Sequence, residues 1–414
     1  MKKFWKTFKK YRIGAIPLFI LFFGIIIRFY NFSDRVVYGP EQGISLISAA
    51  GNFGKPSLLG IPYLLRQTSD GLRIFTAPVF GYTLIPLILI FNYDPLKITI
   101  FFALINIFTG ILIYLIGEKT VNRKVAIFSS ILFFFSSKMI YHSTFIWTSN
   151  YMPFIGTLTI YLIYLFYKTK KISYVFLLGL LSGVGFGIQY FYIIGIVFVF
   201  LIILYFTKKK FKNTLIFISG FVLGELPTLL FDLKHNFYHF KTLTAYFLEI
   251  FKKSGESQIS YYHFLFLYPL LALIGGFLLW SLYKKNKYIS FVLVAVYLIT
   301  NTKIPSGMPH NLSAKDVLSS AKLIASGNPK DFNVTVVGNF DNRGYTLRYP
   351  LEYIYKINVD SVENYTNTTI IYVLGRKDYN FDKPDIWELR TFLPYKVYEV
   401  KSVNDYWSLY KLIK

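Results

Sequence analysis

A series of long apolar runs, separated by short lysine-rich clusters, limits how this sequence can fold more than any other feature. The first run, "IGAIPLFILFFGIII" (Ile13–Ile27), follows the basic segment "MKKFWKTFKKYR" and ends in "RFYNF" without the small-residue cleavage site of a signal peptide. Several runs approach the ~20 residues that an α-helix needs to cross a bilayer. We therefore expect a polytopic α-helical membrane protein with about nine to eleven transmembrane helices.

The later apolar runs all fall before residue 302. They are Pro78–Phe91, Ile98–Ile116, Val125–Phe135, Pro153–Tyr167, Ser173–Ile188, Tyr190–Phe206, Thr214–Phe231, Phe264–Tyr283 and Ile289–Thr300. Between them lie the clusters "EKTVNRK", "KTKK", "TKKKFK" and "YKKNK", which indicate cytoplasmic loops by the positive-inside rule. This pattern favours a membrane protein with a cytoplasmic N-terminus over a nucleic-acid-binding protein, although the net charge is +24.

One run does not fit a simple alternation of crossings. If the first helix runs outward and "EKTVNRK" is cytoplasmic, the 14 residues of Pro78–Phe91 cannot form an ordinary full crossing. Two alternatives stay open at this point: the segment is re-entrant or partly inserted, or one basic loop lies outside.

The stretch between the first and second runs, residues 31–77, is expected to be an outer loop. It contains "YGPEQG" followed by "GISLISAAGNF", whose apolar residues recur at helical spacing and predict a helix on the membrane surface. Glu41 then stands near a helix N-terminus, where the helix dipole stabilises a carboxylate. Glu41 is then either an ordinary helix cap with a structural role, or a functional residue that acts as a general base or as a ligand of a divalent cation, Mg or Mn.

The composition changes after residue 301, which divides the chain into residues 1–301 and 302–414. The second part carries 15 basic and 12 acidic residues, whereas the first carries 30 and 9. "SAKDVLSSAKLIAS" predicts a capped helix, and "NVTVVGNF", "TTIIYVLGR", "YKVYEV" and "WSLYKLIK" predict strands. By parity of the expected crossings, this small α/β domain lies outside the cell membrane.

Polar residues that could carry chemistry gather on the expected outer side, where all five histidines fall. The absence of cysteine excludes disulfides and thiolate metal sites. Asn150 follows Trp147 in an outer loop, and Gln189 occupies a turn where a polar residue needs no special role. Lys234 and His235 could bind an anionic phosphate or simply snorkel at a helix end. Glu225, inside an apolar run, faces either a cavity or the outer interface.

The order of these motifs resembles the GT-C membrane glycosyltransferases, particularly enzymes related to protein O-mannosyltransferases and the aminoarabinose transferase of lipid A. The resemblance runs through the acid-Gln-Gly motif after the first helix, the Pro-led short helix, "W-x-x-N-x-x-P" in another outer loop, the "GxQY" turn and "FDLKHNF". It covers roughly residues 10–240 and extends more weakly into the outer domain.

The resemblance implies a site at the outer face. It assigns the role of base or metal ligand to Glu41, with Gln42 beside it, and a second polar group to Asn150. It places Lys234 and His235 near the lipid phosphate. The departures from the family pattern include Pro40 before the acid, the lack of a carboxylate beside Asn150, and Tyr190 or Phe191 where a histidine is often found.

The implied activity is transfer of one hexosyl or pentosyl group from a polyprenyl-phosphate donor to a glycan, lipid or protein acceptor. Glu41 would deprotonate or orient the acceptor hydroxyl, while Lys234, His235 and Arg73 would neutralise the leaving phosphate. Gln189 completes the expected substrate-binding set. A lipid-linked oligosaccharide flippase, or a non-catalytic membrane protein with an outer binding domain, are the alternatives.

Overall fold

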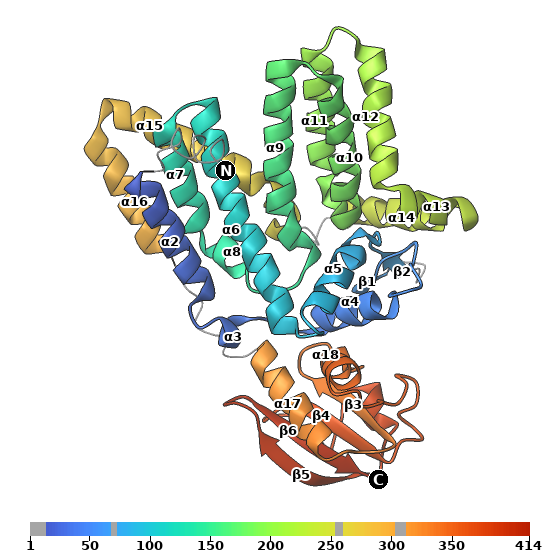
Figure 1. The fold of residues 1–414 in the computed structure, drawn as a ribbon. Coiled ribbons are helices and arrows are strands. Elements are labelled where there is room, and N and C mark those ends of the chain that lie inside the picture. Colours follow the sequence, from blue (N-terminus) through green and yellow to red (C-terminus); the bar gives the residue numbers. More distant parts are fainter. Residues whose placement is uncertain (1–13, 68–72, 253–259, 303–311) are drawn as a thin grey trace.

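The structure is a computed structural model that describes residues 14–67, 73–252, 260–302 and 312–414. The basic N-terminal segment and His310, both noted in the sequence, lie outside these ranges. Figure 1 shows a layer of long helices stacked on a small sheet domain at the C-terminal end. A stretch of short helices and a strand pair lies between these two parts.

The apolar runs all form helices. These are α2 (Ala15–Phe29), α5 (Val79–Ile90), α6 (Pro95–Thr120), α7 (Arg123–Phe134), α9 (Met152–Thr169), α10 (Ile172–Ile188), α11 (Ile193–Phe206), α12 (Lys210–Gly224), α13 (Leu226–Lys234), α15 (Tyr268–Lys285) and α16 (Lys287–Asn301). Short helices connect them: α3 (Phe32–Arg35), α8 (Ser137–Tyr141), η1 (Thr148–Tyr151), η2 (Tyr190–Tyr192) and η3 (Tyr261–Leu267). The prediction of a mainly helical chain is confirmed.

Few of these helices can cross a bilayer by length and composition alone. In the described ranges, Pro95–Thr120 and Tyr261–Lys285 meet both criteria, and a bent pair, α12 with α13, makes a third. Five further apolar helices are shorter, with 10 to 17 residues. With the bent pair and all five short helices the number of spans reaches eight, so the expected nine to eleven crossings would also require α7 or α9 to span.

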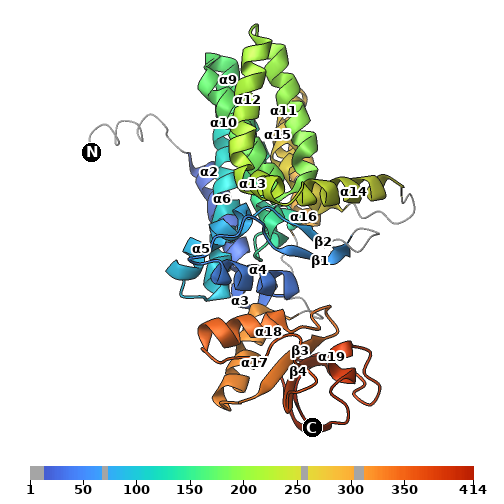
Figure 2. The same cartoon turned by 90° about the vertical axis from the view of Figure 1, so that its right-hand side faces the viewer.

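The expected single helix Thr214–Phe231 is wrong in one respect: the chain bends by 76° between α12 and α13. Glu225 sits at the break with φ −100° and ψ 8°, and Pro227 lies in the first turn of α13, where its missing N–H costs no helical hydrogen bond. After the bend, α13 and α14 (Tyr238–Lys252) project sideways from the helical layer (Figure 2).

The outer loop folds as expected into a helix, but it starts earlier than the apolar pattern indicated. α4 spans Pro40–Gly51, so Glu41 lies inside its first turn. A strand pair, β1 (Pro62–Gln67) and β2 (Arg73–Phe75), follows. The 12-residue helix α5 lies beside α4 at the end of the helical layer that faces the sheet domain (Figure 1).

The C-terminal part forms a four-stranded sheet in the order β3-β4-β6-β5. Its strands are β3 (Phe332–Val337), β4 (Ile370–Arg376), β5 (Lys396–Ser402) and β6 (Trp407–Ile413); β3 and β4 are parallel and the other pairs antiparallel. The helices are α17 (Ala314–Ser326), α18 (Tyr345–Tyr349), η4 (Pro350–Ile354) and α19 (Trp387–Arg390). Ser313 and Asp316 form the capping box at the start of α17, so the predicted helix and all four strands are confirmed.

One apolar core joins the helical layer to this domain. It includes Tyr38 and Leu46 near α4, together with Val317 of α17 and Leu347 of α18. The backbone N–H of Ala314 donates to the Val36 carbonyl at 2.9 Å. Gly43 of α4 lies so close to α18 that an added Cβ would be 2.6 Å from the Tyr345 carbonyl oxygen. The domain is therefore fixed directly against the helix that carries Glu41.

Candidate functional site

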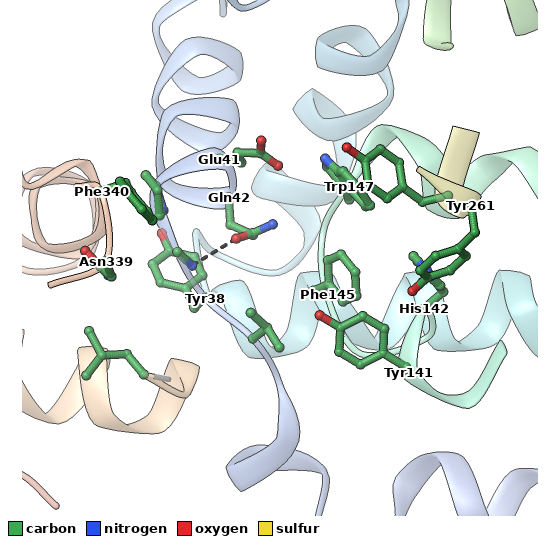
Figure 3. Close-up of a pocket in the computed structure, with 15 residues that line it drawn as sticks. Tyr38, Glu41, Gln42, Tyr141, His142, Phe145, Trp147, Tyr261, Asn339 and Phe340 are labelled. Atoms are coloured by element: carbon green, nitrogen blue, oxygen red, sulfur yellow. Dashed lines mark hydrogen bonds between the residues drawn. The ribbon is translucent and has the colours of Figure 1, made fainter. Parts of the chain in front are cut away.

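A pocket of about 380 Å³ opens beside the N-terminus of α4 (Figure 3). Five segments that are far apart in the sequence contribute to it: the start of α4 with the residues before it, the turn between α8 and η1, η3, Leu312 before α17, and the loop after β3. Seven of its fifteen described lining residues are aromatic: Tyr38, Tyr141, Phe145, Trp147, Tyr261, Tyr262 and Phe340. Pockets with aromatic walls and a few fixed polar groups are typical of sites for small organic ligands.

Glu41 is exposed at the mouth of this pocket, in the first turn of α4. Gly39 is the N-cap and Pro40 occupies the first helical position, where a backbone N–H has no intrahelical partner. The departure at Pro40 therefore removes no hydrogen bond that the helix needs. The positive end of the helix dipole favours the ionised form of the Glu41 carboxyl.

Gln42 holds the turn in place rather than reaching into open space. Its Oε1 accepts from the Gly39 N–H at 2.9 Å (Figure 3), and its Nε2 donates to the Ile146 carbonyl at 3.1 Å. This buried amide ties the start of α4 to the segment that precedes Trp147. It thereby positions Glu41 opposite the Trp147 indole.

His142 supplies the pocket with a histidine of defined orientation. Its Nδ1 lies 2.8 Å from Asn150 Oδ1, while Asn150 Nδ2 donates to the Phe145 carbonyl at 2.7 Å. Because an amide oxygen accepts, Nδ1 carries the hydrogen, and Nε2 accepts from the Tyr261 hydroxyl at 3.2 Å. Burial lowers the pKa of His142 to about 4, so its ring is neutral near pH 7.

The C-terminal domain also reaches the pocket. Asn339 and Phe340, in the loop after β3, line its edge, and the Phe340 side chain is 81% exposed. Asp341 anchors this loop, since its carboxylate accepts from the backbone N–H groups of Tyr345 and Thr346 at 2.9 and 2.8 Å. These hydrogen bonds fix the loop that carries the Phe340 ring at the edge of the pocket.

The expected site residues fall into two groups. Glu41 and Gln42 line the pocket, and Asn150 supports it through His142. Gln189 is buried behind this region, where its Nε2 donates to Ser149 Oγ at 3.0 Å.

The expected phosphate-binding residues lie elsewhere. Arg73 is exposed on β2, and Lys234 and His235 are exposed at the end of α13; none of these three is among the described residues that line the Glu41 pocket. His235 stacks on Phe231 and contacts its carbonyl through Nδ1 at 2.9 Å. The bend at Glu225 directs α13 away from α4.

Lys138 is a cation that sequence reasoning missed. Its Nζ lies 4.3 Å from the centroid of the Tyr261 ring, and its charge contributes to the low pKa of His142. It occupies α8, four residues before His142, so a helix turn brings both side chains to one face. The i,i+4 spacing of Lys138 and His142 is the sequence feature that could have indicated this proximity.

The donor set limits what a metal could do here. The described residues contain no group of three or more His or acidic side chains close enough to hold an ion. Glu41 is the single carboxylate among the described residues that line the pocket. These residues do not fit a metal held by protein ligands alone.

Comparisons with known proteins agree with this architecture. Residues 76–229 match the family model described as dolichyl-phosphate-mannose-protein mannosyltransferase. A protein of Aquifex aeolicus (strain VF5) is 26% identical over 326 residues, which are 72% of this chain and 60% of that relative. The chain thus spans about 60% of the length of the curated relative that it matches.

Two solved structures are similar over nearly their whole lengths. ArnT from Cupriavidus metallidurans in the apo state aligns with a TM-score of 0.53 and 10% identity, covering 96% of this chain and 97% of ArnT. The same protein bound to undecaprenyl phosphate gives 0.51 and 11%, with 96% and 98% covered. The chain has the GT-C fold. The resemblance that the motif order indicated is therefore confirmed, and the GT-C alignment includes the C-terminal domain.

Proposed function

We propose that this GT-C protein is a membrane glycosyltransferase that moves one sugar from a polyprenyl-phosphate donor to an acceptor hydroxyl. The observation that carries the proposal is Glu41, placed by α4 at an aromatic pocket beside the oriented His142. The family match over residues 76–229 and the fold shared with ArnT, which binds undecaprenyl phosphate, support the class of donor.

In this mechanism Glu41 is the general base. Its carboxylate accepts the proton of the acceptor hydroxyl as that oxygen forms a bond to the anomeric carbon of the sugar. The bond from the anomeric carbon to the phosphate oxygen breaks, and polyprenyl phosphate leaves with the electron pair. The aromatic rings around Trp147 provide flat apolar faces for the sugar ring.

Lys138 is the cation we propose for the leaving phosphate. Its Nζ lies over the ring of Tyr261, which lines the pocket, although Lys138 itself is not among the described lining residues. Lys234, His235 and Arg73 stay in the proposal as contacts for more distant parts of the lipid head group. A flexible ammonium suits a phosphate because it acts as a point charge without a fixed geometry. Gln42, Asn150 and Gln189 act by positioning the residues that line the pocket.

Glu41 is the residue that would hold a divalent cation, Mg or Mn, together with a donor phosphate, and the ion would supply positive charge for the leaving group. Mg²⁺ is commonly held by one or two carboxylates together with substrate phosphates. No step above runs through such an ion, and activity before and after EDTA treatment tests for it.

The sidedness of the reaction is part of the proposal. We place the pocket and the C-terminal domain on the extracytoplasmic face of the cell membrane, with a cytoplasmic N-terminus, because the lysine clusters lie at the opposite ends of the helices. Several of the short apolar helices must then span the membrane in this protein.

The decisive experiment measures transfer from a radiolabelled polyprenyl-phosphate sugar in membranes that contain the wild type, Glu41→Gln or Glu41→Ala. We expect both variants to lose a factor of about 10² to 10⁴ in rate, the usual contribution of a general base. Glu363→Gln, an exposed carboxylate of the C-terminal domain, is the matched control and should retain activity. Full activity in both Glu41 variants would overturn the assignment, and transport of intact lipid-linked oligosaccharide without transfer would favour the flippase alternative.

A further inference from the structure

A second, larger cavity of about 680 Å³ lies away from the Glu41 pocket and shares no lining residue with it. It is enclosed by the end of α10, the start of α11, the bend between α12 and α13, and α14. The bend of 76° creates this space, because α13 and α14 turn aside instead of continuing the packing of α12 (Figure 2).

The walls of this cavity are mainly hydrocarbon. Six phenylalanines line it: Phe186, Phe191, Phe221, Phe240, Phe247 and Phe264. At its rim, Ile193 and Ile194 are about 40% exposed and Phe240 is 62% exposed. A hydrocarbon chain can enter through an apolar rim of this kind, because covering apolar surface removes it from water and is favourable.

Acidic groups stand at the polar end of the cavity. Asp232 is engaged, because Oδ1 accepts from the His239 N–H at 2.8 Å and Oδ2 from the Phe240 N–H at 3.1 Å. His239 is also engaged, through Nε2 to the Tyr190 hydroxyl at 2.8 Å. The Asp232 carboxylate thus accepts hydrogen bonds from backbone N–H groups in the first turn of α14, which have no partner within the helix.

Glu225 is different. The residue is 4% exposed and lines the cavity. The Thr228 side chain and the Gly187 backbone lie beside its carboxyl group, but no donor meets its Oε1 with hydrogen-bond geometry among the described residues. A buried carboxyl oxygen without a donor costs free energy that a ligand could recover. No lysine or arginine occurs among the described residues that line this cavity, so a positive charge must come from elsewhere.

We propose that this cavity binds a long-chain amine, with the chain between the phenylalanines and the ammonium head at Glu225. The head would form charge-assisted hydrogen bonds with the carboxylate, in surroundings where such bonds are strong. A lipid phosphate does not fit, because it would face Glu225 and Asp232 with no cation on the walls. This site is independent of the proposed transferase activity, which depends on the other pocket.

Binding can be measured by native mass spectrometry of the purified full chain in detergent, with dodecylamine, dodecanol and dodecyl phosphate as probes of equal chain length. We expect dodecylamine to bind at least tenfold more tightly than dodecyl phosphate. Glu225→Gln should weaken amine binding ten- to hundredfold, the usual range for a hydrogen bond to a charged group. Glu118→Gln, which removes a carboxylate at the other end of the helical layer, should leave it unchanged.

Two outcomes would overturn the proposal: equal binding of amine and phosphate, or amine binding that Glu225→Gln leaves intact. Thr244→Trp provides a second test that keeps Glu225, because Thr244 is an exposed residue on the cavity rim and an indole there would fill the space. If Glu225→Gln fails to fold, undiminished dodecylamine binding in Thr244→Trp overturns the proposal instead. Transfer activity is measured in parallel, so failure of this site is distinguishable from failure of the Glu41 assignment.

Discussion

His142 shows how a single buried residue links the pocket to pH. Because burial lowers its pKa to about 4 from 6.5, the folded state binds fewer protons than the unfolded state between these values. The wild type should therefore lose stability as the pH falls from 6.5 to 4, by about 3 kcal/mol from this residue. His142→Gln cannot be protonated, so we expect its unfolding midpoint, measured from pH 7 to pH 4, to fall less. Parallel pH profiles for the two proteins would contradict the buried neutral ring.

At the same scale, the sequence predicted some site residues and missed others for a physical reason. Glu41 was predictable because its environment is local: a Gly-Pro turn, a helix start and the Gln42 cap lie within four residues. The pairing of His142 with Asn150 depends on how residues 143–149 turn, which no periodicity records. The positions of Lys234 and His235 depend on the bend at Glu225, since a straight helix would have directed them elsewhere.

At the scale of elements, the contact between α4 and α18 determines how the C-terminal domain meets the pocket. A Cβ on Gly43 would lie 2.6 Å from the Tyr345 carbonyl oxygen and 2.9 Å from the Thr346 nitrogen. Backbone atoms cannot move aside like a flexible side chain, so Gly43→Ala should cost about 1–3 kcal/mol as the two helices separate. Gly51→Ala, at the other end of α4, meets nothing within 4 Å and should be neutral or slightly stabilising. Thermal unfolding checks both, and equal midpoints would show that the α4–α18 contact adapts.

The positions of helices and strands were largely predictable from the sequence, and the main exception is the bend between α12 and α13. Apolar runs and strand patterns reflect burial along one element, which is why α17, β3, β4 and β6 occur where their patterns predict them. β5 is exposed along its length and pairs with β6. The break between α12 and α13 interrupts a continuous apolar run, and hydropathy along that run does not record a bend. Glu225 and Pro227 were the local signs of that break.

For the whole molecule, the proposed site requires both parts of the chain. α4 and the α8–η1 turn supply Glu41, His142 and Trp147, while the loop after β3 supplies Asn339 and Phe340. A shared core and the Lys315–Asp34 ion pair at 2.8 Å hold these parts together. The acceptor would therefore contact the C-terminal domain as well as the helices, and Phe340→Ala should raise the KM for the acceptor more than it lowers kcat.

The orientation of the whole molecule in the membrane can be tested with single cysteines, since the native chain has none. α6 has 26 residues and is about 39 Å long, which exceeds the roughly 30 Å of a bilayer core. Lys97 near its start and Ser402 on β5 are exposed, and Val121 just after its end is 43% exposed. An impermeant thiol reagent added to intact cells should label Lys97→Cys and Ser402→Cys, and label Val121→Cys only after permeabilisation. Labelling of Val121→Cys alone would reverse the orientation and place the Glu41 pocket on the cytoplasmic face, where nucleotide sugars would replace lipid donors as the natural candidates.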